Sequence, residues 1–334
     1  MTEPQNGIIL TGVKPTGTPH IGNYLGAIEP ALRRASEYSE AFFFIPDYHA
    51  LNSVQDGETM KELTRAVAAT WLAAGLDPSK IHLYRQSDIP EIFELDVILN
   101  NFVPKGWMNK MHSYKASVDK NRAAGKLDDF EVNMGLYNYP ILMTSDILVF
   151  NATHIPVGRD QIQHVEIARD IAQRFNNQYQ DTVFVLPEHV VADGIAELPG
   201  IDGRKMSKSY GNTIPLYAGR EGWEQAVRKI VTDSIDHTDE TIRETVLFKI
   251  YATLVTEDKA NELAAQLVEK TIGWKQAKDL LLEALEARLG EQATRYQELM
   301  QKPEYLDIVL AEGAAKVRPI AKAKLAYVKQ VLGF

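Results

Sequence analysis

The sequence predicts an α/β protein in which a doubly wound parallel sheet is followed by a region made almost wholly of helices. Short β-rich runs alternate with stretches of helical periodicity over the first 210 residues, which is typical of a parallel sheet with helices on both faces. From Glu221 onward the pattern is helical, with Leu281, Leu285 and Leu289 at helical spacing. A chain of 334 residues is also long for a single hydrophobic core, so more than one domain is expected.

Each element is predicted from local periodicity and from its flanking residues. The run at 8–11 is β-rich and ends in a loop with many glycines and prolines, as strands before functional loops often do. Apolar residues at 21, 25, 28 and 32 recur at helical spacing. In chain order, the expected elements are a strand at 8–11, a helix at 21–35, a strand at 41–45, a helix at 60–72, and strands at 81–84 and 183–186.

Composition excludes several classes of protein. The chain has no cysteine, which rules out disulfides, cysteine-ligated zinc, iron–sulfur clusters and a catalytic thiol. With 36 basic against 45 acidic residues, the net charge is −9, which argues against an indiscriminate nucleic-acid or DNA binder. No apolar run approaches the roughly 20 residues of a spanning helix, and no leader pattern begins the chain. A cytoplasmic protein without a membrane segment is therefore expected.

The motif Lys205-Met206-Ser207-Lys208-Ser209 predicts a loop that binds phosphate. It carries two ammonium groups and small hydroxyl residues between Gly203 and Gly211, and ammonium groups on a loop can bind a polyphosphate. A solvated basic turn is the alternative for an arbitrary pair of lysines at this spacing. The full five-residue motif is too specific for that alternative to be preferred.

A second motif, Pro19-His20-Ile21-Gly22-Asn23, lies where the first strand passes into the first helix. Gly22 allows a ligand to approach the backbone closely, and the helix N-terminus offers free N–H groups to an anion. His20 and Asn23 can donate hydrogen bonds to the same anion. The alternative is that His20 merely caps the helix. The position of the motif between strand and helix favours a nucleotide site.

Together the two motifs resemble the HIGH and KMSKS signatures of class I aminoacyl-tRNA synthetases. Further segments look like those of tryptophanyl-tRNA synthetases, and the similarity is close over about residues 7–212. These segments are GVKPTGTPHIGNYLG at 12–26, DYHA at 47–50, YPILMTSD at 139–146, PVGRDQIQH at 156–164 and RDIAQRFN at 169–176. The resemblance implies a Rossmann-like catalytic domain with a C-terminal helical domain.

The resemblance also implies which residues bind each substrate. The catalytic group is His20, Gly22, Asn23, Lys205 and Lys208. The ATP-binding set is Lys14, Pro15, Thr16, Gly22, Asn23, Gly158, Arg159, Asp160, Lys205, Met206, Ser207, Lys208 and Ser209. The tryptophan-binding set is His49, Tyr139, Met143, Asp146 and Gln161, and Lys115 is a further candidate for a phosphate contact. ATP is the expected co-substrate, with Mg²⁺ bound to it and no protein cage for the metal visible.

The choice of amino acid can be argued from the pocket residues. Indole has one hydrogen-bond donor and no acceptor, so its pocket needs a single acceptor within apolar walls, and Asp146 is the candidate. An aspartate also suits a phenol, so Met143 is the better discriminator, because tyrosyl enzymes usually carry glutamine there. The alternative for Asp146 is that it caps a helix. The alternative for His49 is that it is a core histidine whose hydrogen bonds are satisfied within the protein.

Two positions depart from the family pattern. Arg159 stands where glutamate is common, and Lys14 where glutamine is common, so both add positive charge near the expected nucleotide. We hypothesise that Lys14 contacts the substrate carboxylate or the α-phosphate and changes the response to substrates or inhibitors. A surface position is the alternative for Lys115.

The expected function is that of a tryptophan–tRNA ligase, which activates L-tryptophan with ATP and transfers it to tRNA(Trp). The expected organisation is a catalytic domain at 1–212 with a helical insertion around 90–130 at a homodimer interface, a helical anticodon-recognition domain at 213–315, and a C-terminal helix at 316–334 packing back on the catalytic domain. That last segment holds five basic residues and no acidic one, which also suits contact with phosphate. The alternatives are a tyrosyl enzyme, a related nucleotidyltransferase, and a non-catalytic paralogue that binds tryptophan or tRNA.

Overall fold

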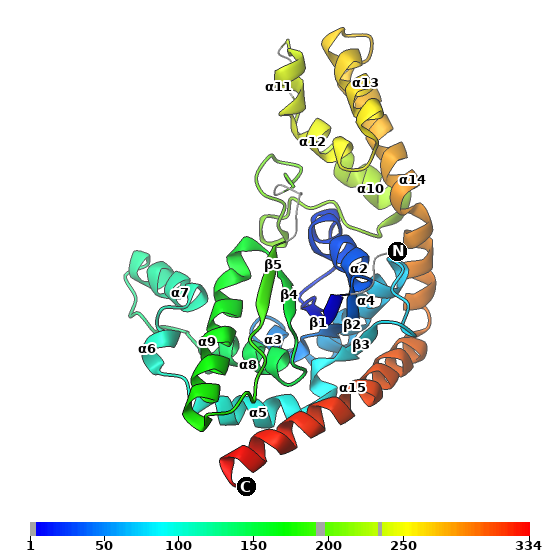
Figure 1. Cartoon of the computed structure of the whole chain (residues 1–334). Helices are drawn as coiled ribbons and strands as arrows, with labels where there is room; N and C mark the ends of the chain where they lie inside the picture. Colours follow the sequence, from blue (N-terminus) through cyan, green and yellow to red (C-terminus); the bar gives the residue numbers. More distant parts are fainter. Residues whose placement is uncertain (1–4, 192–197, 233–235) are drawn as a thin grey trace.

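The computed structural model describes residues 5–191, 198–232 and 236–334, and at its centre lies a parallel sheet of five strands in the order β3-β2-β1-β4-β5 (Figure 1). All neighbouring strands run parallel. The strands are β1 (Gln5–Gly12), β2 (Tyr38–Ile45), β3 (His82–Arg85), β4 (His154–Val157) and β5 (Glu188–Val191). The predicted fold class is confirmed by this arrangement.

Helices connect the strands and cover both faces of the sheet (Figure 1). Within the sheet-containing part they are α1 (Ile21–Asn23), a π-helical turn (Tyr24–Ile28), α2 (Glu29–Ala35), α3 (Asp47–Ala50), α4 (Gly57–Ala73), α5 (Pro90–Asn100), α6 (Lys105–Met108), α7 (His112–Ala123), α8 (Met134–Leu148) and α9 (Ile162–Tyr179). The remainder is helical, with α10 (Gly219–Arg228), α11 (Asp239–Arg243), α12 (Val246–Ala252), α13 (Glu257–Val268), α14 (Trp274–Met300) and α15 (Pro303–Leu332). None of the described helices is long and apolar enough to cross a membrane.

Alternating side chains of the central strands build two hydrophobic cores. Ile9 and Phe43 belong to one core, which continues into the helices after residue 213. Leu10 and Phe42 point to the opposite face and belong to the other core, which includes α5, α8, α9 and part of α15. This division follows from the two-residue period of a strand, which sends neighbouring side chains to opposite faces.

The predicted strand at 183–186 is wrong, since the strand in this region is β5 at Glu188–Val191. Val183 and Phe184 are instead fully buried in a loop. The Asn176 side chain occupies both backbone groups of Phe184, accepting from its N–H at 2.9 Å and donating to its carbonyl at 2.8 Å. A backbone bonded in this way to a side chain cannot also join a strand ladder.

Helix α15 lies against the edge strand β3. A Cβ atom on Gly313 would come within 1.8 Å of the Leu83 carbonyl oxygen, so only glycine allows this approach. Four of the five basic residues after 315 bond to acceptors of the sheet-containing part. These bonds join Lys316 to the Pro78 carbonyl, Arg318 to Glu91, Lys324 to the Val183 carbonyl and Lys329 to Glu94. The expectation that this segment contacts phosphate is therefore not supported, because most of its cations bind protein oxygens.

We predict that Gly313→Ala destabilises the protein, because the added methyl group overlaps the β3 backbone. A loss of about 1–3 kcal/mol in the free energy of unfolding is expected from overpacking of this kind, measured by urea denaturation. Gly290→Ala in α14 is the matched control, since a Cβ atom there meets only Glu286 Cγ at 3.7 Å. That control should gain up to about 1 kcal/mol from helix propensity. Equal stability of the two variants would contradict the packing of α15 described here.

Candidate active site

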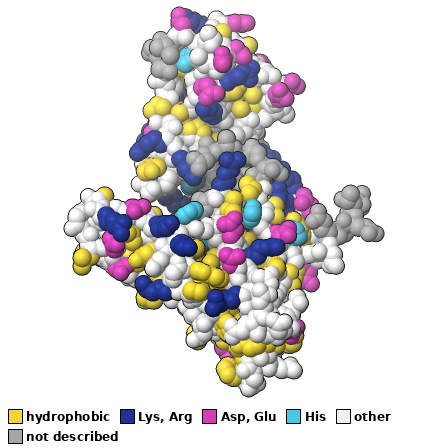
Figure 2. All heavy atoms as spheres, turned by 60° about the vertical axis from the view of Figure 1, so that its left-hand side comes forward, with side chains coloured by type: hydrophobic (Ala, Val, Ile, Leu, Met, Phe, Trp, Pro, Cys, Tyr) yellow, Lys and Arg dark blue, Asp and Glu magenta, His cyan; other side chains and the backbone are white. Residues whose placement is uncertain are grey.

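The predicted site residues gather at the carboxyl ends of β1 and β4. These strands are neighbours at the centre of the sheet, and the strand order reverses between them, which is the position of the ligand-binding crevice in open α/β sheets. The loop after β1 carries Lys14 and Gly17, and the loop after β4 carries the 3₁₀ turn Arg159–Gln161. Figure 2 shows several Lys and Arg side chains around the waist of the molecule, where the upper helices join the sheet-containing body.

The first motif forms a capped helix start. The His20 Nδ1 atom accepts from the Asn23 backbone N–H at 3.3 Å, while the Asn23 side chain accepts from the His20 N–H at 3.1 Å. Burial lowers the pKa of His20 to about 4, and the Lys208 charge acts in the same direction. The ring is therefore neutral at pH 7. Because Nδ1 accepts, the proton lies on Nε2, and His20 both caps the helix and keeps a donor for a ligand.

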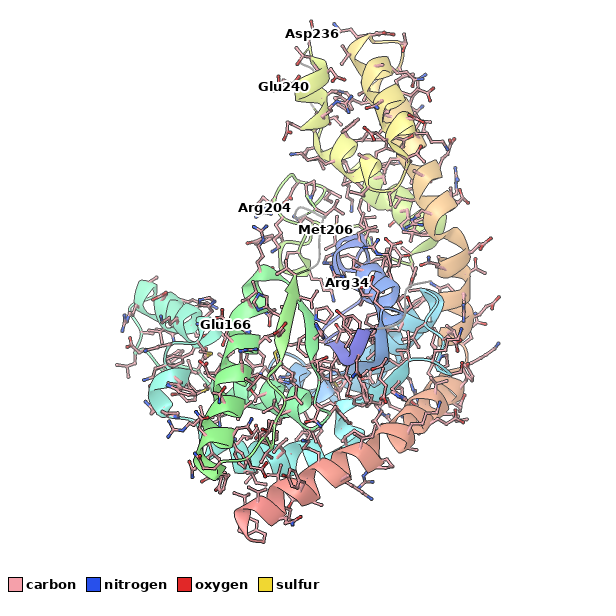
Figure 3. The ribbon with its side chains drawn as sticks, viewed as in Figure 1. Arg34, Glu166, Arg204, Met206, Asp236 and Glu240 are labelled. Carbon is pink, nitrogen blue, oxygen red and sulfur yellow. The ribbon has the colours of Figure 1, made fainter. Side chains whose placement is uncertain are left out.

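The helix then continues through an unusual turn. Tyr24–Ile28 is π-helical, a local form that is often found at functional sites. A Cβ atom on Gly22 would lie 3.0 Å from His20 Nδ1 and 3.5 Å from the sulfur of Met206. Gly22 therefore leaves room for the His20 ring, and Met206 of the second motif lies within van der Waals reach, beside this part of the chain in Figure 3.

The loop of the second motif is organised by Asn212, which sequence reasoning missed. This side chain is 2% exposed. Its amide accepts from the Ser207 N–H at 2.8 Å and donates to Asp202 at 2.7 Å and to the Lys205 carbonyl at 3.1 Å. The sequence signal that was available is the place of Asn212 two residues after Tyr210, at the end of the basic motif.

Lys208 reaches from this loop to the loop after β1. Its ammonium donates to the Gly17 carbonyl at 2.7 Å, and Gly17 has a φ of +135°, a backbone conformation that favours glycine. Partial burial lowers the pKa of Lys208. The bond to Gly17 brings a cation next to the helix start, where phosphate is expected.

Backbone pairing holds the two motifs together. Ile21 N–H donates to the Ile214 carbonyl at 3.0 Å, and Leu216 N–H donates to the Pro19 carbonyl at 3.0 Å, with an antiparallel bridge between His20 and Pro215. The segment 214–216, which follows the basic loop, is thus fixed to the segment that begins α1.

A buried carboxylate lies deeper in the body. Asp146 is fully buried in the last turn of α8, so the alternative that it caps a helix is wrong. Gln86 donates to both of its oxygens at 2.9 and 3.0 Å, and His49 Nε2 lies 3.0 Å from Oδ2. Burial raises the pKa of Asp146, and the bonds to His49 and Gln86 oppose that effect. Sequence reasoning missed Gln86, although it directly follows the carboxyl end of β3.

The other predicted tryptophan-site residues adjoin this carboxylate. The Tyr139 hydroxyl donates to Gln161 at 3.0 Å, and the Tyr139 and His49 rings meet edge to face at 5.4 Å. The Lys14 ammonium lies 4.8 Å from the centre of the Tyr139 ring, and desolvation lowers the pKa of Lys14 although part of the residue is exposed. Met143 lies one turn before Asp146 on α8, partly buried. The structure therefore brings this predicted set together.

Most of the remaining predicted residues lie at the surface. Thr16, Gly158, Arg159, Lys205 and Ser209 are exposed, and Pro15 is buried. Ser209 bonds to Ser207 at 2.9 Å. The side chain of Asp160 lies outside the described residues. Lys115 is exposed on α7, and among the described residues its ammonium has no hydrogen bond or ion pair to the rest of the site.

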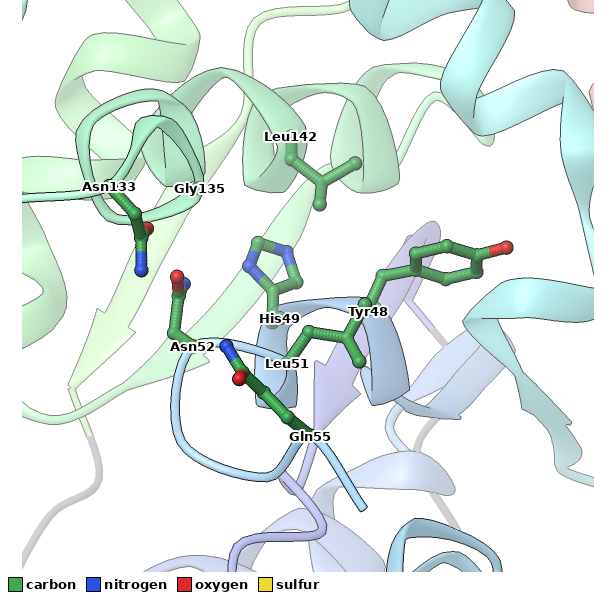
Figure 4. A pocket seen from close by; sticks show the side chains of 8 residues that line it. All are labelled: Tyr48, His49, Leu51, Asn52, Gln55, Asn133, Gly135 and Leu142. Atoms are coloured by element: carbon green, nitrogen blue, oxygen red, sulfur yellow. The ribbon is translucent and has the colours of Figure 1, made fainter. Parts of the chain in front are cut away.

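A hollow of about 310 Å³ opens on the outer side of His49. Figure 4 shows the imidazole between Leu142 on one side and the amides of Asn52 and Asn133 on another. Tyr48 and Leu51 at its rim are each 44% exposed. The hollow shares His49 with the predicted tryptophan set, whereas Asp146 is not among its lining residues.

The geometry combines a capped helix start beside a lysine with a buried carboxylate acceptor, an arrangement typical of an enzyme that binds a phosphate-bearing and a second, smaller substrate, and comparison with known proteins gives the family. The family model of the class I tRNA synthetases for tryptophan and tyrosine (W and Y) matches residues 3–290 of the chain. The chain belongs to this family.

Relatives within the family specify the branch. A tryptophan–tRNA ligase of Bordetella parapertussis is 48% identical over 98% of this chain and 73% of its own length. That of Neisseria meningitidis is 47% identical, and the match covers 97% of each chain. A Campylobacter jejuni tryptophanyl-tRNA synthetase solved with ADP and tryptophan has a TM-score of 0.88 at 39% identity, over 98% of this chain and 100% of its own. The predicted enzyme class and the predicted tryptophan branch are confirmed.

Asp96 on α5 gives a pH-dependent prediction. Burial raises its pKa to about 6, and the Asp146 charge adds to this. Its Oδ1 atom is buried without a hydrogen-bond partner among the described residues. In the unfolded chain the group loses its proton near pH 4, so the folded protein holds more protons between pH 4 and 6 and its stability falls as pH rises through that window.

Asp96→Asn should therefore raise the free energy of unfolding at pH 7.5 by on the order of 2 kcal/mol and change it little at pH 4. Urea denaturation at both pH values measures the difference. Asp119→Asn on α7, an exposed carboxylate, is the control and should show no such pH dependence. If Asp96→Asn raised the free energy of unfolding no more at pH 7.5 than at pH 4, the assignment of a buried, charged Asp96 would be refuted.

Proposed function

We propose that this chain is a tryptophan–tRNA ligase whose crevice aligns the tryptophan carboxylate with the α-phosphate of ATP. The observation that supports the proposal is the difference in charge between the two ends of the crevice. A buried acceptor, Asp146, lies at one end, and the neutral His20 and cationic Lys208 lie at the other. Tyr139 and Lys14 lie between the two ends, in ring contact with His49 and with each other.

The first step forms tryptophanyl-adenylate. A carboxylate oxygen of tryptophan attacks the α-phosphorus, the bond from that phosphorus to the bridging oxygen breaks, and pyrophosphate leaves. The protein supplies alignment and stabilises charge on the departing phosphates. His20 Nε2–H and the ammonium groups of Lys205 and Lys208 provide that stabilisation. Mg²⁺ accompanies ATP in this proposal, bound to its phosphates.

Tryptophan is selected by the buried end of the crevice. The donors of Gln86 and His49 already bind Asp146, so the carboxylate is presented as an acceptor for the indole N–H. Tyrosine offers a hydroxyl that also accepts, and Met143 provides no donor for it. Tyr139 and Gln161, bonded to each other, are assigned to the substrate ammonium.

In the second step the terminal ribose hydroxyl of tRNA attacks the acyl carbon, and AMP leaves. We assign residues 1–212 to catalysis, 213–315 to recognition of the tRNA(Trp) anticodon, and 316–334 to a helix that stabilises the catalytic part. The bonds of Lys316, Arg318 and Lys324 to that part support the last assignment. A cytoplasmic location stays a prediction.

We also propose a homodimer through the surface of α3, α5 and the start of α8. Val97 and Met134 are 65% and 66% exposed, and Tyr48 is 44% exposed, which is unusual for large apolar side chains unless they meet a partner. The Tyr48 ring packs on Phe93 of α5 at 4.4 Å, so the two helices offer one continuous surface. The helical segment around 90–130 contributes to it.

Exchange of labelled pyrophosphate into ATP, with tryptophan or with tyrosine, tests the proposed function. Exchange with tryptophan alone is expected. Exchange with tyrosine would favour the tyrosyl alternative, and exchange with neither would favour the non-catalytic paralogue or a nucleotidyltransferase. Lys208→Ala controls for a contaminating host enzyme and should lower the rate about a hundredfold, because a donor to the transition state is lost.

Lys14→Gln tests the role of the unusual lysine. Its ammonium lies over Tyr139 inside the crevice, so its removal should raise KM for tryptophan or for ATP at least about fivefold, as loss of a charge-assisted hydrogen bond does. Lys322→Gln on α15, at an exposed position, is the control for a general effect of lost charge. Unchanged KM for both substrates would eliminate a substrate contact by Lys14.

A further inference from the structure

The side chain of Gln292 on α14 joins three segments of the molecule. Its Oε1 atom accepts from the Tyr217 hydroxyl at 2.9 Å, and its Nε2 atom donates to the Tyr24 hydroxyl at 3.1 Å. One amide therefore uses its acceptor on one tyrosine and its donor on the other. Tyr24 and Tyr217 are 3% and 4% exposed, so these bonds lie away from bulk water, where hydrogen bonds are costly to lose.

Tyr24 directly continues a segment that binds phosphate in the proposed function, and Tyr217 directly continues the segment that pairs with it. Tyr24 follows Asn23 and begins the π-helical turn. Tyr217 follows the residues that pair with Pro19 and Ile21. Gln292 thus bonds to one residue downstream of each segment of the backbone pairing that holds the two motifs together.

Other contacts fix the same junction. Gln297, also on α14, donates to the Tyr217 carbonyl at 3.2 Å, and the Tyr296 and Tyr217 rings lie 5.1 Å apart. Arg288 forms an ion pair with Glu29, at the start of α2. Because all these residues lie on one helix, α14 holds the junction along several turns, and Gln292 is the member that reaches both tyrosines.

The other half of α14 lies far from the crevice. Leu280, Glu283 and Ala287 line a hollow of about 510 Å³ between α12, α13 and α14, in the upper helices of Figure 1. Gln292 follows Ala287 by little more than one helical turn. A continuous helix of 27 residues therefore connects this hollow with the two tyrosines.

We propose that Gln292 is a positioning residue that transmits the placement of α14 to both phosphate-binding segments. By fixing Tyr24 and Tyr217 to one amide, it sets the distance between the helix start at His20 and the loop of Lys208. Loss of the amide loosens this distance and lowers the stabilisation of the departing pyrophosphate. The tryptophan end of the crevice, which rests on α3 and α8, is unaffected. This inference rests on the proposed function.

Gln292→Met, which keeps the length of the side chain but has neither donor nor strong acceptor, tests the proposal by pyrophosphate exchange. We expect kcat/KM for ATP to fall about three- to tenfold, in line with two lost hydrogen bonds, with KM for tryptophan within twofold of wild type. Tyr24→Phe and Tyr217→Phe should each reproduce part of the loss. Combining either with Gln292→Met should add little, because the bonds act as a unit.

Glu291→Gln on the exposed face of the same helix is the matched control and should behave as wild type. Melting temperatures of all variants distinguish positioning from unfolding at the assay temperature. An equal loss in tryptophan affinity, additive effects of the Gln292 and Tyr24 variants, or a Gln292→Met enzyme equal to the control would each overturn the inference. Absence of exchange by the wild type would instead reject the proposed function.

Discussion

The backbone pairing between Pro19–Ile21 and Ile214–Leu216 is the constraint on which the rest of the site depends. It places the start of α1 opposite the loop that carries Lys208, although strands β2 to β5 separate these segments in sequence. Trp223 of α10 adds a bond from its indole to the Pro215 carbonyl at 2.9 Å. The helical part therefore helps to fix the segment that pairs with the start of α1, at the end of the site proposed to bind phosphate.

Burial, more than the number of ionisable groups, determines which side chains of the crevice carry a charge. His20 is neutral because its ring is buried beside a cation, so in the proposed function it offers phosphate a hydrogen-bond donor and no positive charge. At the other end, Asp146 keeps its acceptor character through donors from Gln86 and His49. An acidic protein can serve anionic substrates in this way, because few cations are needed where water is scarce.

Sequence patterns predicted the elements with clear periodicity and the residues within recognisable motifs. They did not predict β4, which has only four residues, one of them a proline, or the loop conformation at Phe184. Gln86 and Asn212 were missed for a different reason. Their roles depend on hydrogen bonds to residues brought near by the fold, and a single amide carries no local pattern. The basic residues of α15 were misjudged likewise, since their acceptors lie in distant segments.

The contact between α15 and β3 also bears on how the chain is made. β3 is an edge strand of the sheet, and an open edge is a site for unwanted pairing between chains. The helix that lies on its backbone at Gly313 follows every strand of the sheet in sequence. During synthesis on the ribosome, domains fold from the N-terminus as they emerge, so the sheet forms before its cover exists. Protection of this edge therefore waits until α15 has been made, and the interval before that is the period of greatest exposure to misassembly.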